Sequence, residues 1–153
     1  MTLEPFLHPE LALVLEERTT CENLFKQVCS RIQKVHPDCD SQQLLKALVE
    51  REASTSTVTP EGVAFPHAII EGFPGASIVV ITARDEVDFG PDQATPGIIF
   101  CLFGDAGKPW EHVRILARLA RISHSEQARN RLRESSNPSE LLQALLAEDR
   151  SHG

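Results

Sequence analysis

The sequence has few basic residues for its length. Its 153 residues include 15 lysines and arginines against 22 aspartates and glutamates, which gives a formal net charge of −7 at pH 7. This charge excludes a general nucleic-acid-binding protein, because such proteins need positive charge against the phosphates. An acidic surface instead favours encounter with a protein partner that has a basic face.

The sequence also lacks a long apolar segment. Its longest apolar runs are far too short to span a bilayer, and residues 1–5 carry no basic cluster followed by an apolar stretch. We therefore expect no membrane insertion, no signal peptide and a cytoplasmic protein. The length fits one domain with an ample core.

Closely spaced cysteine pairs are missing as well. The four cysteines, at positions 21, 29, 39 and 101, form no Cys-x-x-Cys motif, so we expect reduced thiols. His36 and Cys39, with Cys29 upstream, could contribute to a zinc site, although no second paired motif completes one. Buried or incidental cysteines are the simpler interpretation, and we expect no metal and no cofactor.

Hydrophobic periodicity predicts the fold class. Apolar residues at helical spacing predict helices from residue 21 to a break at Pro37, over 42–52, from Pro109 through 120, around 128–132 and from Pro138 onward. Short apolar or β-branched runs predict strands at 11–15, 63–65, 76–83 and 98–103. Helices before and after a compact sheet give an α/β sandwich. We expect a single domain over residues 1–148 and a frayed tail at 149–153.

The tripeptide Phe65-Pro66-His67 is the most informative feature of the chain. It ends the apolar run of residues 62–65, which predicts a strand. Proline has no N–H donor, so a strand usually stops there, and we expect His67 at a strand end, in a turn. Functional side chains are common in such positions.

Four residues together suggest that a histidine carries a phosphoryl group. A neutral imidazole is a nucleophile near neutral pH, so His67 could accept the group. Arg51 and Thr57 could hold its oxygens. His112, at the start of an apolar helix stripe, could donate a hydrogen bond to the same oxygens.

These residues also have purely structural interpretations. His67 could be a hydrogen-bonded turn residue, and His112 could be a residue at a helix boundary. Arg51 could complement the dipole at a helix end. If the site is real, Glu52 or Glu71 could orient a histidine ring.

The residues and their spacing resemble the type-2 IIA domain of the bacterial phosphoenolpyruvate-dependent phosphotransferase system. In that family an Arg-Glu pair is followed, six residues after the arginine, by a threonine, and then by a Gly-apolar-Ala-apolar-Pro-His block. Arg51-Glu52, Thr57 and residues 62–67 match this pattern. His112, ahead of an apolar helix, matches the family's second histidine.

The resemblance spans nearly the whole chain and implies a small mixed β-sheet flanked by helices. It implies that His67 accepts phosphate from HPr or a related phosphocarrier protein, with Arg51, Thr57 and His112 as the supporting site. The phosphate then passes to a sugar-transporter IIB domain or acts as a regulatory signal, and the single-domain form is most similar to the nitrogen-regulatory branch. Residues 68–71 depart from many relatives, because they are apolar and then acidic instead of small and then basic.

Three functions fit these residues. The first is a phosphotransferase relay component in which His67 transiently carries phosphate. The second is a regulatory binding module whose interface is gated by phosphorylation, without onward transfer. The third, a metal-dependent hydrolase with His67 and His112 as ligands, is weaker. Glu71 and Glu111 lie near the two histidines in sequence, but neither completes a recognisable ligand motif on a helix. In the first two, we expect a partner to dock on apolar groups around Ile69, Ile70 and Phe73.

Overall fold

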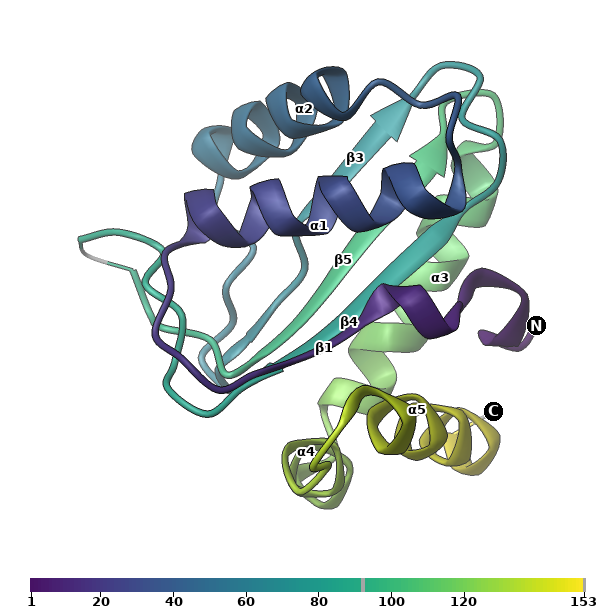
Figure 1. Ribbon diagram of the computed structural model, residues 1–153. Coiled ribbons are helices and arrows are strands. Elements are labelled where there is room, and N and C mark those ends of the chain that lie inside the picture. Colours follow the sequence, from purple (N-terminus) through teal and green to yellow (C-terminus); the bar gives the residue numbers. More distant parts are fainter. Residues whose placement is uncertain (92, 153) are drawn as a thin grey trace.

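A five-stranded mixed sheet forms the centre of the computed structural model, which describes residues 1–91 and 93–152 (Figure 1). β1 runs parallel to β4, β4 runs antiparallel to β5, and both β2 and β3 run parallel to β5. β2 and β3 therefore share one side of β5 and form an edge of the sheet. The strands are β1 (Ala12–Leu15), β2 (Val63–Ala64), β3 (His67–Ile70), β4 (Ser77–Ala83) and β5 (Ile98–Asp105).

Helices cover both faces of the sheet (Figure 1). One face carries α1 (Cys21–Val35) and α2 (Ser41–Ser54), and the other carries α3 (Pro109–Ser123), α4 (Glu126–Arg133) and α5 (Pro138–His152). Two short 3₁₀ helices, η1 (Glu4–Phe6) and η2 (Pro9–Leu11), precede β1. Successive residues of β5 face alternate cores, as a strand buried on both sides requires. The predicted α/β sandwich, with its small mixed sheet, is confirmed.

The helices begin where their capping residues predict. Thr20 Oγ1 accepts the N–H of Asn23 at 3.3 Å, and Asn137 Oδ1 accepts the N–H of Glu140 at 2.9 Å. In α1, the apolar stripe at helical spacing is buried against the sheet. No helix in the described part of the chain combines the length and the hydropathy needed to cross a membrane.

The turn expected at His67 is wrong. His67 is the first residue of β3 and pairs with Leu102 of β5. Pro66 cannot donate a hydrogen bond, but its carbonyl accepts the N–H of Leu102 at 2.9 Å, so the chain stays beside β5. The strand pairing is therefore interrupted only at Phe65 and Pro66, and His67 stands where it resumes.

The end of the chain is helical, whereas a frayed tail is expected over residues 149–153. α5 continues to His152, and residue 153 lies outside the described residues. Asp149 is only 2% exposed. Its carboxylate accepts hydrogen bonds from the N–H of Leu3, at 2.8 Å, and from the guanidinium of Arg118. This buried carboxylate connects the N-terminal segment, α3 and α5, and so keeps the last turn ordered.

Replacing Asp149 with alanine should lower the free energy of unfolding by about 3 kcal/mol, because the Arg118 guanidinium and the Leu3 N–H would lose their buried acceptor. Urea denaturation at neutral pH measures this change. Arg150→Ala is the control, since Arg150 is exposed on the same helix turn, and it should stay within about 0.5 kcal/mol of the unsubstituted protein. Equal stability of the two variants would contradict the role of Asp149.

Candidate functional site

His67 is held as one neutral tautomer by two hydrogen bonds. Its Nδ1 lies 2.9 Å from the carbonyl oxygen of Phe65, and its Nε2 lies 3.1 Å from Nε of Arg51. A carbonyl can only accept a hydrogen bond and a guanidinium can only donate one. The proton of the ring is therefore on Nδ1, and Nε2 presents a lone pair. The side chain as a whole is half-buried.

Arg51 is fixed at two points beside that lone pair. It lies in the last turn of α2, and its Nη1 also donates to the carbonyl oxygen of Thr55 at 2.9 Å. The guanidinium is thus oriented by its own helix end before anything binds. Its planar fork of N–H groups suits phosphate oxygens, and its Nε is next to Nε2 of His67.

His112 lies against His67 from the opposite helical layer. It is in the first turns of α3, is 5% exposed, and its ring centroid is 5.0 Å from that of His67 at an interplanar angle of 55°. Within residues 1–91 and 93–152, neither of its ring nitrogens has a hydrogen-bond partner. Burial, together with the neighbouring His67, lowers the pKa of His112 to about 4. At neutral pH His112 is therefore uncharged and offers one free N–H donor.

A glycine in β5 makes room for this second ring. A Cβ atom placed on Gly104 would lie 2.8 Å from Nδ1 of His112, closer than such atoms approach in folded proteins. Gly104 pairs with Ile69 of β3, two residues beyond His67. A glycine inside a strand often marks a close approach, but the strand predicted from sequence ends at residue 103, and only the structure extends β5 over Gly104.

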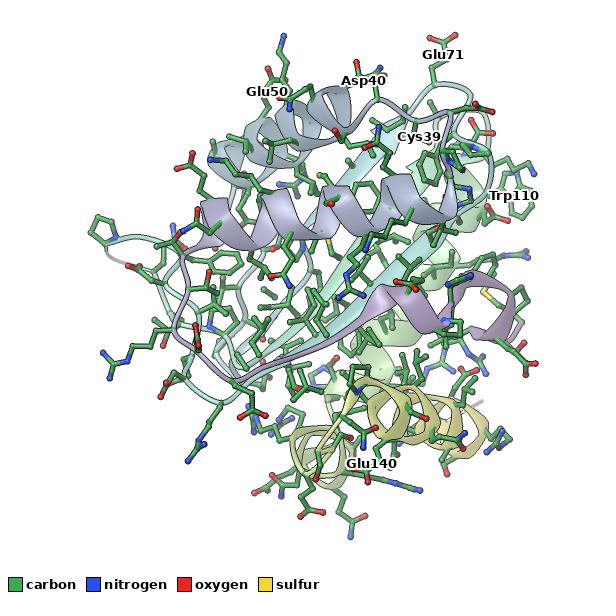
Figure 2. The ribbon with its side chains drawn as sticks, in the orientation of Figure 1. Cys39, Asp40, Glu50, Glu71, Trp110 and Glu140 are labelled. Atoms are coloured by element: carbon green, nitrogen blue, oxygen red, sulfur yellow. The ribbon has the colours of Figure 1, made fainter. Side chains whose placement is uncertain are left out.

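Thr57 and Glu52 form a cluster that contacts the backbone beside His67. The carboxylate of Glu52 accepts the Thr57 hydroxyl at 2.7 Å and the Thr57 N–H at 2.8 Å. Thr57 Oγ1 in turn accepts the N–H of Phe65 at 3.1 Å. Of the two carboxylates that the sequence offers for orienting a ring, Glu52 is in this cluster, whereas Glu71 is exposed and points away from the sheet (Figure 2).

The structure thus brings Arg51, His112 and His67 into one site, with Thr57 attached through the backbone of Phe65. Over residues 1–91 and 93–152, no group of three or more His, Cys, Asp and Glu side chains is arranged to hold a metal ion. The residues considered for a zinc site, His36 and Cys29 among them, have other environments. His36 Nε2 shares a hydrogen bond with Ser77 Oγ at 3.0 Å, and burial raises the pKa of Cys29 to about 12, which keeps its thiol protonated.

Comparison with known proteins gives the family. Residues 5–148 match the family described as phosphoenolpyruvate-dependent sugar phosphotransferase system, EIIA 2. The chain belongs to this family, and the resemblance seen in the motif around His67 is confirmed.

Two curated relatives and two solved structures illustrate the similarity. The nitrogen regulatory protein of Pseudomonas aeruginosa is 27% identical over 145 residues, which cover 94% of each chain. The mannitol-specific IIA component of Geobacillus stearothermophilus is 31% identical over 101 residues, covering 64% of this chain and 67% of the relative. The crystal structure of IIA-Ntr from Neisseria meningitidis superposes with a TM-score of 0.82 at 25% identity, covering 94% and 98% of the two chains. The IIA mannitol domain of Escherichia coli shares the fold, with a TM-score of 0.73 at 18% identity over 90% and 97%.

Substituting Gly104 with alanine should displace the His112 ring, because the added Cβ overlaps Nδ1. We expect a loss of about 1–3 kcal/mol in the free energy of unfolding, together with changed NMR shifts of the His67 and His112 rings. Gly75→Ala is the matched control, since a Cβ there meets nothing within 4 Å, and it should change neither quantity appreciably. Unmoved histidine shifts in the Gly104 variant would contradict the close packing.

Acid should destabilise the protein through His112. The folded-state pKa is lowered from 6.5 to about 4, so the unfolded chain binds a proton more readily between these values, and stability falls as the pH falls through that window. Each pH unit contributes up to about 1.4 kcal/mol. Urea denaturation at several pH values should show a steeper decrease for the unsubstituted protein than for His112→Gln, in which the carboxylates still titrate. The same slope in both proteins would contradict this assignment.

Proposed function

We propose that this protein is a histidine phosphocarrier of a phosphotransferase relay. It accepts a phosphoryl group on Nε2 of His67 from an HPr-type protein, and it passes the group to a IIB partner or acts as a nitrogen-type regulator. The observation that carries the proposal is the tautomer of His67. Its proton-free nitrogen accepts a hydrogen bond from an arginine, and the ring lies against a second, uncharged histidine.

Phosphoryl transfer from the donor to His67 needs no cofactor. The Nε2 lone pair of His67 attacks the phosphorus of the donor's phosphohistidine, so that a new N–P bond forms while the donor's N–P bond breaks and its electron pair returns to the donor nitrogen. Nδ1 keeps its proton, so the phosphorylated ring carries a positive charge. The Phe65 carbonyl, which accepts the Nδ1–H, stabilises that charge. A positively charged ring is also a good leaving group when the phosphoryl group moves on.

Arg51 and His112 are the candidate ligands of the phosphoryl oxygens. Arg51 supplies charge and several N–H donors next to Nε2, and His112 supplies a donor whose hydrogen-bonding capacity is unused. Thr57 is the third residue expected to hold these oxygens. Its hydroxyl proton is directed to Glu52, so its contribution in the resting protein is to the backbone of Phe65.

A partner would dock on an apolar surface made of Ile69, Trp110 and Val113. These side chains are 46%, 56% and 63% exposed, and they lie on β3 and on the first turns of α3, beside the two histidines. Phe73 and Ile70, also expected on this surface, pack instead against the core beneath α1 and α2. Phe73 is 4% exposed and stacks on Phe103, and Ile70 is partly buried, so the expectation is wrong for these two residues. The E. coli mannitol IIA enzyme, which has this fold (TM-score 0.72, 19% identity), was solved in complex with phosphorylated IIB, and this makes a IIB domain the candidate recipient.

His67→Ala should abolish incorporation of acid-labile phosphate from a phosphorylated HPr-type protein, because it removes the accepting nitrogen. The assay is transfer of labelled phosphate, with circular dichroism to show that the variant is folded. His124→Ala is the control, since His124 is an exposed histidine at the end of α3, and it should label like the unsubstituted protein. Undiminished labelling of His67→Ala would overturn the proposal.

The same experiment separates the relay from the gated binding module. Addition of a IIB domain should discharge the label if the protein is a relay component. If the label stays and the phosphorylated form alone binds or releases a target protein, the protein is a regulator without onward transfer. The similarity to a nitrogen regulatory protein over 94% of each chain is the observation that favours this second function.

A further inference from the structure

Consecutive residues of α2 act on the two ring nitrogens of His67. Arg51 donates directly to Nε2. Its neighbour Glu52 is connected to Nδ1 by three successive contacts: the Glu52 carboxylate holds Thr57 by its N–H and its hydroxyl, Thr57 Oγ1 accepts the N–H of Phe65, and the Phe65 carbonyl accepts the Nδ1–H. One turn of α2 thus contains both the residue that bonds Nε2 of His67 and the residue that is connected to its Nδ1.

Glu52 determines which way the Thr57 hydroxyl points. A hydroxyl has one proton and two lone pairs. The 2.7 Å bond to the Glu52 carboxylate is charge-assisted, and it takes the proton. The lone pairs are then left for the N–H of Phe65. The threonine therefore serves as an acceptor for the backbone, and this direction depends on the carboxylate.

The ring of Phe65 is stacked on Phe100, whereas its backbone N–H is bonded to a side chain, that of Thr57, and not to the sheet. β2 ends at Ala64, and Phe65 lies on the sheet edge formed by β2 and β3. The next residue, Pro66, has no N–H, and only its carbonyl is bonded to β5. Without the bond to Thr57, the N–H of Phe65 would lose its partner, and the Phe65 carbonyl could turn away from His67.

We propose that Glu52 is a positioning residue that keeps the proton of His67 on Nδ1, and hence the reactive lone pair on Nε2, by holding Thr57 and through it the Phe65 carbonyl. The consequence for phosphoryl transfer rests on the proposed function of His67. The tautomer itself is a property of the resting protein and can be measured without any phosphate donor.

The inference is tested by measuring the tautomer of His67. The ¹⁵N NMR shifts of its ring nitrogens, in protein labelled with ¹⁵N-histidine, report the ratio of the two tautomers. Glu52→Gln and Thr57→Val should each change the ratio of the Nδ1–H to the Nε2–H form of His67 by about five- to tenfold, the effect of losing one hydrogen bond. Thr57→Ser keeps the hydroxyl and should leave the ratio unchanged. Glu50→Gln, an exposed carboxylate two residues away on α2, should also leave it unchanged.

Phosphoryl transfer supplies the second measurement. In Glu52→Gln and Thr57→Val, the limiting rate of labelling should fall by about tenfold, while the donor concentration for half-maximal rate stays the same, because docking is unaffected. The double variant should be no slower than the slower single variant, since both changes break the same connection. If Glu52→Gln does not fold, the tautomer ratio and the labelling rate of Thr57→Val test the inference.

Folded variants that keep the Nδ1–H form and the unsubstituted rate would overturn the inference. So would a loss of stability with no change of tautomer, because Glu52 would then only brace the loop after α2. Failure of the proposed function looks different: the unsubstituted protein would not accept phosphate on His67, although the tautomer would still respond to Glu52.

Discussion

The open edge of the sheet at Phe65 is the constraint on which the site depends. An edge strand presents N–H and C=O groups that have no strand partner, and such groups rarely stay unpaired where water is restricted. Between β2 and β3, the N–H of Phe65 is bonded to Thr57 and its carbonyl to Nδ1 of His67. The tautomer of His67 is thus a consequence of satisfying the backbone. A histidine at the same place on an inner strand would have no free carbonyl beside it to hold its proton.

Local signals in the sequence predict the elements and the set of site residues, but not the contacts that connect them. Caps such as Thr20 and Asn137, and the apolar runs, are local, and the helices and four of the strands follow from them. β3 does not follow from local signals, because its pairing depends on β5, which lies far along the chain. The motif around His67 likewise predicts which residues gather. The direction of the Thr57 proton depends on Glu52 and Phe65 together, and spacing contains no information about it.

Errors in the sequence analysis arise from the same cause. Phe73 lies in the loop after β3 and looks like a surface group, but it is buried by stacking on Phe103 of β5. Asp149 is an acidic residue in a polar tail, and such residues are normally solvated. It is buried because Leu3 and Arg118, both distant in sequence, donate to it. Burial of these side chains is decided by partners that no local window contains.

His112 and Arg51 have complementary roles in the proposed mechanism. A buried ring without hydrogen-bond partners costs about 1–3 kcal/mol, and Gly104 is the residue that allows the ring to stay there. The low pKa of His112 keeps it uncharged, so it can donate to a phosphoryl oxygen without repelling the positive ring that forms on His67. The charge comes from Arg51 instead, which is exposed enough to remain solvated.

The two sides of His67 change differently during the proposed transfer. When the Nε2 lone pair forms the N–P bond, the Nε–H of Arg51 loses its acceptor at the moment that phosphoryl oxygens arrive beside it. The bond from Nη1 of Arg51 to the Thr55 carbonyl does not involve His67, so it can keep the guanidinium beside the ring during the transfer. On the other side, the Nδ1–H keeps the Phe65 carbonyl throughout. Hydrogen bonding therefore changes at only one ring nitrogen of His67. A site that moves little between its resting and phosphorylated states has a smaller free-energy cost of reorganisation at each transfer.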